Sequence, residues 1–217
     1  MFDMFPDADL YFALQDEPYA HAMLDLHKPK KSILYPRKDG TWWRDDFYNR
    51  HVQFSQENLE LKRQSLNTID GKRFMGKWDN ILRMFYSVQA CYEILEGHYD
   101  YVIRSRPDVR IKSQISLPSS LDENEIAVPN FYCGDYVWSD KFYVGRQEFS
   151  TKVANLFTDI PEVMANFPIT SDMMTTWMVS ENVLHWAIKH WYGGKTTLIP
   201  EWNIDRYKVN YKNFYTN

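Results

Sequence analysis

Residues 99–112 read YDYVIRSRPDVRIK, and this stretch decides the fold. Tyr99 to Ile103 is a β-rich apolar run, which is typical of a buried strand in the middle of a sheet. Because Pro107 has no N–H group to donate to a ladder, the strand is expected to end by about Arg106. We therefore expect a central strand that leads directly into a charged turn.

Strands and helices alternate on both sides of this stretch. Apolar residues from Lys77 to Glu96 recur with the 3.6-residue period of a helix, and Gly97 suits the end of that helix. Further helices are expected at Glu17 to Leu26, Ser55 to Leu66, Phe149 to Phe157 and Ser171 to Trp191. Further strands are expected at Ala8 to Leu14, Ser32 to Tyr35, Glu125 to Val128, Lys141 to Val144 and Thr196 to Ile199. The alternation predicts an α/β layered fold, and residues 1–217 fit a single domain.

Composition excludes several classes of protein. The chain is 44% hydrophobic and 25% charged, an ordinary globular mixture, and its net charge of −4 argues against a general grip on nucleic acid. No apolar run reaches the ~18 residues of a membrane span, and the opening MFDMFPDADLYF lacks the basic and apolar regions of a signal peptide. Cys91 and Cys133 lie far apart and N-x-[S/T] is absent, which favours a reducing, cytoplasmic location.

The aromatic content is unusually high, at 17% of the residues. One interpretation is a large aromatic core. The other is that some rings line a cleft for sugars or bases, which offer flat faces for stacking. The same two interpretations apply to residues 36–49, PRKDGTWWRDDFYN, where Gly, Pro and Asp indicate a loop.

Charged residues gather where the 99–103 strand ends, namely Arg104, Arg106, Asp108 and Arg110. Ligands of open α/β sheets bind outside the carboxyl ends of the strands. The planar guanidinium of arginine suits phosphate, and an aspartate can hold a divalent ion that bridges to a diphosphate. The turn therefore suggests a site for an anionic ligand, with a surface cluster of ion pairs as the alternative.

Two acids further along the chain are candidates for general-base catalysis. On one continuous helix, Glu181 shares a face with Trp177 and Leu184, and burial there would raise its pKa toward the range of a general base. Alternatively, Ser180 restarts the helix and Glu181 simply favours its first turn. Asp140 opens the β run DKFYVG after an aromatic stretch. It is expected either to contact the acceptor or donor sugar or to lie at the solvated end of a strand.

The order of these segments resembles a known family. A helix (WDNILRMFYSVQACYEILEG) is followed by YDYVIRSRPDVRI, WSDKFYVGR and SENVL. This is similar to bacterial and viral glycosyltransferase-like proteins with the GT-A nucleotide-sugar fold, a mixed central sheet flanked by helices. The resemblance spans roughly Phe5 to Ile199, and residues 99–111 are its specific part. It implies transfer of a sugar from a nucleoside diphosphate sugar to a glycan acceptor hydroxyl, as in polysaccharide biosynthesis.

The resemblance also implies roles for individual residues. Asp108 would hold Mn²⁺ or Mg²⁺, and either Glu181 or Asp140 would be the acceptor base in an inverting enzyme. Asp79 and Arg83 lie four residues apart on the helix before the central strand, where they form either a surface pair or a contact to the nucleotide. The residues expected to bind the nucleotide sugar are then Arg104, Arg106, Arg110, Asp79 and Arg83.

Two departures from the family pattern leave alternatives open. The usual turn is Asp-any-Asp, but Arg106 replaces the first acid, so a metal binds together with the nucleotide or the arginines neutralise the diphosphate alone. The opening MFDMFPDAD is similar to the region after the family's first strand, so the chain is expected to lack that strand or to bind the nucleotide differently. The alternative function is a non-catalytic carbohydrate- or nucleotide-binding module; a phosphohydrolase that uses Asp108 is a third.

Overall fold

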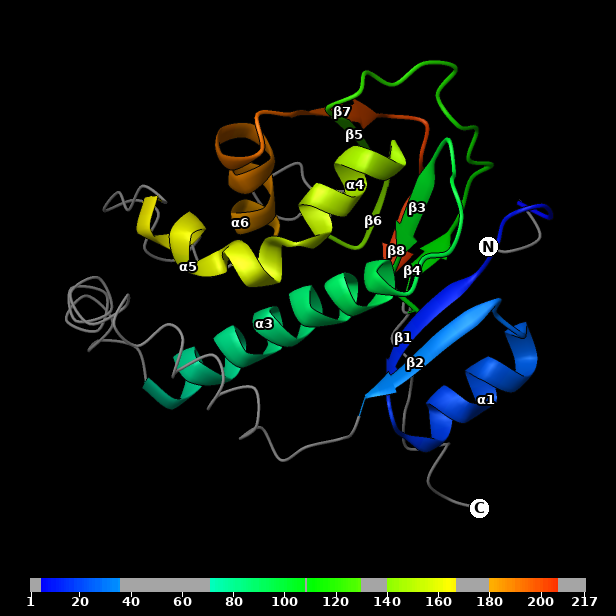
Figure 1. Cartoon of the computed structure of the whole chain (residues 1–217), viewed down its shortest axis with the longest axis horizontal. Coiled ribbons are helices and arrows are strands. Elements are labelled where there is room, and N and C mark those ends of the chain that lie inside the picture. The colour runs from blue at the N-terminus through cyan, green and yellow to red at the C-terminus, as the bar shows by residue number, and fades with distance from the viewer. Residues whose placement is uncertain (1–4, 36–70, 108, 130–139, 167–179, 207–217) are drawn as a thin grey trace.

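A computed structural model of the chain describes residues 5–35, 71–107, 109–129, 140–166 and 180–206 (Figure 1). The helices are α1 (Pro18–His27), α3 (Gly71–Glu93), α4 (Gln147–Ala154), α5 (Leu156–Asn166) and α6 (Ser180–Trp186), which continues into a π-helical segment, Ala187–Trp191. The strands are β1 (Tyr11–Gln15), β2 (Lys31–Tyr35), β3 (Val102–Ser105), β4 (Val109–Ile111), β5 (Glu125–Pro129), β6 (Phe142–Gly145), β7 (Lys195–Ile199) and β8 (Ile204–Arg206). The chain is thus a mixed α/β protein, as the sequence predicts.

The main sheet has four strands in the order β3-β6-β5-β7. Strand β6 runs antiparallel to both of its neighbours, whereas β5 and β7 are parallel. Two smaller ladders accompany this sheet: β1 and β2 are parallel and joined through α1, and β4 and β8 form an antiparallel ribbon. The sheet is therefore mixed, with one reversed strand in its interior.

The position of β3 corrects one expectation. It does not lie in the middle of the four-stranded ladder but at one end of it, paired with β6. The central strands are β5 and β6, and every residue of both is buried. The burial of β3 agrees with this position, since three of its four residues are partly exposed, whereas those of β5 and β6 are all buried. Its expected end before Pro107 is confirmed.

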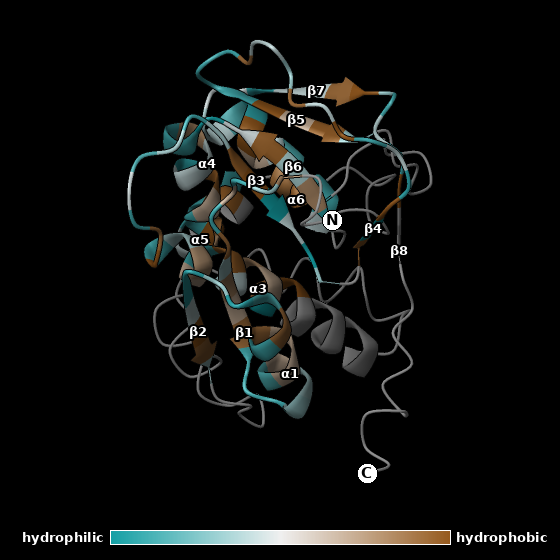
Figure 2. Ribbon diagram, turned by 90° about the vertical axis from the view of Figure 1, so that its right-hand side faces the viewer, coloured by the Kyte–Doolittle hydropathy of each residue, from teal (hydrophilic) through white to brown (hydrophobic). Residues whose placement is uncertain are grey.

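The strands of the main sheet carry many hydrophobic residues (Figure 2), and the two faces of the sheet bury different cores. Ile126, Val128 and Tyr143 point toward the helices, where they pack with apolar residues of α3, α4, α5 and α6. Phe142 and Val144 point to the opposite face, which packs against Trp202 and the β4–β8 ribbon. This alternation follows from the two-residue period of a strand and gives β6 a role in both cores.

Helix α3 crosses the molecule between the β1–β2 unit and helices α4 and α5 (Figure 1). Ile81, Leu82 and Phe85 belong to the core on the helical face of the sheet, which confirms the periodic pattern in this helix. On the side toward β2, the Ser87 hydroxyl lies 2.6 Å from the Tyr35 hydroxyl. Gly97 adopts φ +102° in the connection to β3, four residues after the helix ends at Glu93.

The remaining expectations concern two helices, an aromatic loop and the absence of a membrane span. The single helix expected at Phe149 to Phe157 is instead two helices, α4 and α5, which meet at Asn155. The helix expected at Ser55 to Leu66 and the aromatic loop at 36–49 lie outside the described residues. In the described part of the chain, no helix combines the length and the apolar character needed to cross a membrane.

Candidate functional site

Charged and polar side chains meet where β3 ends and where β6 and α6 begin. We call them the acid–base cluster: Arg106, Asp140, Lys141, Ser180 and Glu181. The backbone N–H of Arg106 donates to the carbonyl oxygen of Lys141 at 2.9 Å, one step beyond the last β3–β6 pair. This bond fixes the two strand ends side by side. The described part of helix α6 begins with Ser180 and brings this residue and Glu181 to the same place.

Asp140 is the most deeply buried member of the cluster, with 1% of its surface exposed. Its Oδ2 atom accepts a hydrogen bond from the Ser180 hydroxyl at 2.7 Å, and Arg106 Nη1 lies 3.9 Å from the same oxygen. Its Oδ1 atom is buried and has no hydrogen-bond partner among the described residues. A buried acceptor without a partner costs free energy, so this oxygen is a candidate contact for a ligand.

Glu181 is the second acid of the cluster, and like Asp140 it contacts the Ser180 hydroxyl. Its Oε2 atom is 3.0 Å from the Ser180 hydroxyl, and its Oε1 atom is 3.7 Å from Nζ of Lys141. Burial raises the pKa of Glu181, and the negative charge of Asp140 raises it further. Its own backbone N–H and the charge of Lys141 oppose this shift without reversing it, and so would the Ser180 hydroxyl if it donated to the ionised carboxylate. Glu181 is thus a buried acid that holds its proton more strongly than an ordinary glutamate.

Arg104 lies on β3, two residues before Arg106, and its side chain is on the helical face of the sheet, beside Tyr143. Its guanidinium is 5.7 Å from the centre of the Tyr143 ring, within the range of a cation–π contact. The Nη1 atom is buried without a hydrogen-bond partner among the described residues. Its positive charge also acts on the Cys91 thiol, although burial dominates there and raises the pKa of Cys91 to about 11.

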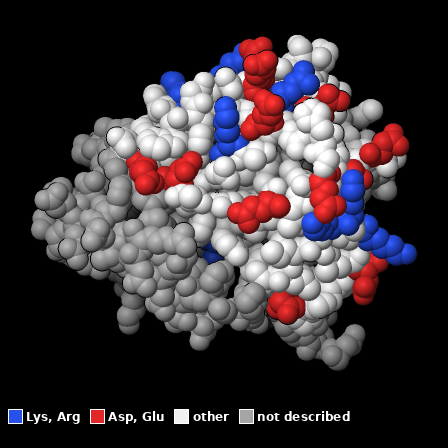
Figure 3. Space-filling view, viewed as in Figure 1, with Lys and Arg blue, Asp and Glu red and all other residues white. Residues whose placement is uncertain are grey.

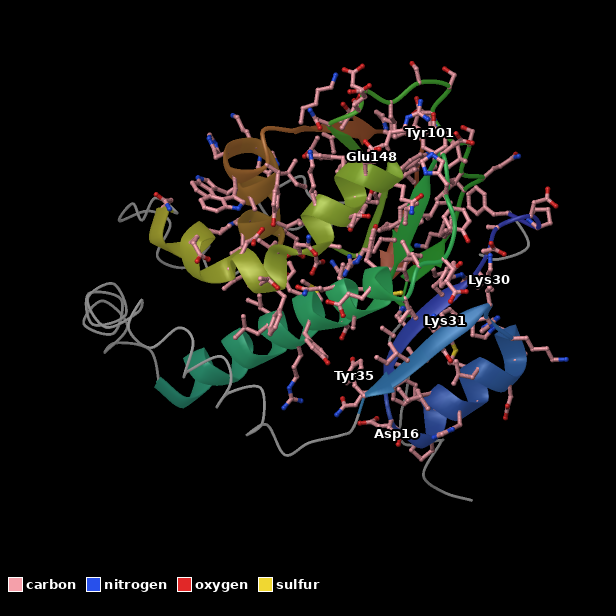
Figure 4. All side chains as sticks on the ribbon, in the orientation of Figure 1. Asp16, Lys30, Lys31, Tyr35, Tyr101 and Glu148 are labelled. Atoms are coloured by element: carbon pink, nitrogen blue, oxygen red, sulfur yellow. The ribbon has the colours of Figure 1, made fainter. Side chains whose placement is uncertain are left out.

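The other residues expected at the site lie elsewhere. Arg110 is exposed on β4, opposite Asp205 in the β4–β8 ribbon. Arg83 lies on α3, and its charge acts on the hydroxyl of Tyr35 at the end of β2 (Figure 4). The side chain of Asp79 and the whole of Asp108 fall outside the described residues. The structure therefore brings together Arg106, Asp140 and Glu181, with Arg104 next to them along β3.

Two members of the cluster escape the sequence argument, Lys141 and Ser180. Lys141 reads as an ordinary strand residue and Ser180 as a helix start. The sequence offers one indication of both residues: Lys141 directly follows Asp140, and Ser180 directly precedes Glu181.

A second charged cluster lies at the start of β2 and differs in character. Lys30 donates to Asp9 at 2.7 Å, and Lys31 pairs with Glu96. Figure 4 labels Lys30 and Lys31, and Figure 3 shows basic and acidic side chains next to each other on this side of the molecule. The Tyr99 hydroxyl donates to the same Asp9 carboxylate at 2.7 Å. These side chains are largely exposed, and exposed ion pairs contribute little to stability. They link the β1–β2 unit to the connection after α3.

The described residues do not fit a resident divalent metal. Among them, no group of three or more His, Cys, Asp or Glu side chains could hold a metal ion. The two carboxylates of the cluster each lie near a cation, Arg106 for Asp140 and Lys141 for Glu181. The expected metal ligand, Asp108, lies outside the described residues.

Replacement of Glu181 by Gln is expected to flatten the dependence of stability on pH. The folded pKa of Glu181 is raised, so between the unfolded and folded pKa values the folded state binds a proton that the unfolded state has released. Wild-type stability therefore falls as pH rises through this window, whereas Gln does not titrate. The advantage of Glu181→Gln should grow by about 1.4 kcal/mol per pH unit there and stay constant at higher pH.

Urea unfolding at a series of pH values measures this difference. The matched control is Glu148→Gln, because Glu148 is an exposed acid on α4 (Figure 4). The control should follow the wild-type curve. Parallel curves for wild type and Glu181→Gln would contradict the raised pKa of Glu181.

Comparison of the chain with protein-family models, with curated proteins and with solved structures gives no match.

Proposed function

We propose that this chain is a glycosyltransferase that moves a sugar from a nucleoside diphosphate sugar to a hydroxyl group of a glycan acceptor. The observation that carries the proposal is the acid–base cluster itself, in which two buried carboxyls and two cations meet at the end of β3. Such a transfer needs both kinds of group: a base for the acceptor hydroxyl and positive charge for the departing diphosphate. The mixed sheet with helices on one face is compatible with the GT-A fold that the sequence resembles.

The cluster suggests a division of roles in this reaction. The acceptor oxygen attacks the anomeric carbon while Oδ1 of Asp140 takes the proton of the hydroxyl. The bond from the anomeric carbon to the diphosphate oxygen breaks, and its electron pair leaves with the diphosphate. Arg106 and Lys141 would offset the negative charge that develops there. Asp140 is favoured over Glu181 as the base because its Oδ1 has no partner among the described residues.

Nucleotide binding is the first test of this proposal. Isothermal titration calorimetry with a set of uridine, guanosine and cytidine diphosphate sugars should detect binding of at least one. Arg106→Ala should weaken that binding by about 10–100-fold, the effect of losing one charged hydrogen-bonding partner. Lys152→Ala is the matched control, because Lys152 is an exposed cation on α4 and should leave the affinity unchanged.

The same titrations examine the divalent metal and the alternative function. If Asp108 binds Mn²⁺ together with the diphosphate, affinity should fall in EDTA and in Asp108→Asn; indifference to both would favour neutralisation by arginine alone. A nucleotide sugar that binds but is never consumed with any acceptor would favour a non-catalytic binding module. No binding of any nucleotide sugar would overturn the proposed function.

A further inference from the structure

The hydroxyl of Ser180 lies between the two acids of the cluster. Its oxygen is 2.7 Å from Oδ2 of Asp140 and 3.0 Å from Oε2 of Glu181. The two acids come from different parts of the chain: Asp140 lies two residues before β6, and Glu181 is in the first turn of α6. Their connection is therefore a product of the tertiary fold. Both distances are those of hydrogen bonds between oxygen atoms.

The number of hydrogens limits what this arrangement can be. A serine hydroxyl carries one hydrogen, so Ser180 can donate fully to only one of the two carboxyls. If both carboxyls were ionised, the other contact would bring two oxygen atoms together with no hydrogen between them. If one carboxyl is protonated, it donates to the Ser180 oxygen while Ser180 donates to the other. Both short contacts are then ordinary hydrogen bonds.

The surroundings indicate which acid holds the proton. Asp140 has the shorter contact to Ser180, at 2.7 Å, and Nη1 of Arg106 lies 3.9 Å from the same carboxylate oxygen. Glu181 faces Lys141 at 3.7 Å, but burial and the charge of Asp140 outweigh this cation and raise the pKa of Glu181. His185 lies one turn further along α6, and burial lowers its pKa to about 4, so it is neutral near neutral pH.

We propose that Asp140 and Glu181 hold a single proton between them, which rests on Glu181 and is linked to Asp140 through the hydroxyl of Ser180. Ser180 accepts a hydrogen bond from Glu181 and donates one to Asp140. Oδ1 of Asp140, which has no hydrogen-bond partner among the described residues, is the atom that would take the proton of an acceptor hydroxyl. Ser180 and Glu181 are in this view positioning residues. Only their use in catalysis rests on the proposed function; the proton count holds for the protein without any substrate.

Infrared spectroscopy of the ligand-free protein tests this proposal directly, because a protonated carboxyl has a carbonyl stretch that an ionised carboxylate lacks. Wild type should keep one such band to a pH above the usual range of glutamate. Glu181→Gln should remove it, and the exposed control Glu148→Gln should not. In Asp140→Asn the band should titrate about one pH unit lower, because the neighbouring negative charge is gone.

The decisive measurement is whether Ser180→Ala lowers or raises the pKa of Glu181. If protonated Glu181 donates to Ser180, Ser180→Ala removes the acceptor and should lower the pKa of Glu181 by about one unit, and Ser180→Thr should restore it. If Ser180 instead donates to ionised Glu181, Ser180→Ala should raise this pKa, and the proposal is wrong. The absence of a persistent band in wild type would overturn it too. Either result would contradict only the shared proton. Nucleotide binding and sugar transfer are tested separately, by calorimetry and by measurement of turnover.

Discussion

Asp140→Asn should lower turnover of a nucleotide sugar with its acceptor by about 10²–10⁴-fold, the usual effect of losing a general base. The amide keeps the shape of the side chain, and its oxygen can still accept from Ser180, so the cluster should stay assembled. It cannot take a proton from an acceptor hydroxyl. The affinity for the nucleotide sugar should therefore remain nearly unchanged, and the loss should appear in kcat. This expectation rests on the proposed function.

Two further variants make the experiment decisive. Asp122→Asn changes an exposed acid near the amino end of β5 and should leave kcat unchanged. Glu181→Gln resembles the protonated resting state of Glu181 and should retain most of the turnover. If Glu181→Gln instead loses 10²–10⁴-fold while Asp140→Asn remains active, the base is Glu181 and the assignment of Asp140 is wrong. Measurement of kcat and KM separately for each variant distinguishes these outcomes.

The sequence predicts the elements whose patterns are local and long. Helix α3 repeats its apolar residues over many turns, and the β1–α1–β2 unit follows from two apolar runs on either side of a short helix. The β4–β8 ribbon could not be predicted in this way. Each of its strands has only three residues, too few for an alternating pattern, and Val109 finds its partner in Arg206, far along the chain. Such pairings depend on the tertiary fold.

The same distinction applies to the candidate site. Asp140 and Glu181 each attract attention as acids next to apolar runs, but nothing in the sequence indicates that one hydroxyl, that of Ser180, bridges them. That contact depends on where α6 meets the end of the β3–β6 pair. Arg104 shows the reverse case. Its place in a charged run suggests a ligand contact, whereas strand alternation turns it toward the helices and the Tyr143 ring.

Trp202→Ala is expected to lower the free energy of unfolding by about 3–5 kcal/mol, which is large compared with the 5–15 kcal/mol of a typical domain. Trp202 is 1% exposed, and its ring meets that of Phe142 edge-on at 5.7 Å. Its indole N–H donates to the carbonyl oxygen of Ser116 at 3.2 Å. Truncation would remove these contacts and leave a cavity behind β6. Trp202→Phe should cost less, because it keeps an aromatic ring in the same space.

Trp191→Ala is the matched control, since Trp191 is 40% exposed at the end of the π-helical segment and should lose much less stability. Urea unfolding of both variants measures the difference. Trp202 lies on the face of the sheet opposite α6, so Trp202→Ala should leave the pKa of Glu181 unchanged under conditions where the variant remains folded. Equal losses for the two variants would contradict an aromatic core on this face. A large loss at Trp202 alone would assign this part of the high aromatic content to packing rather than to a sugar-binding cleft.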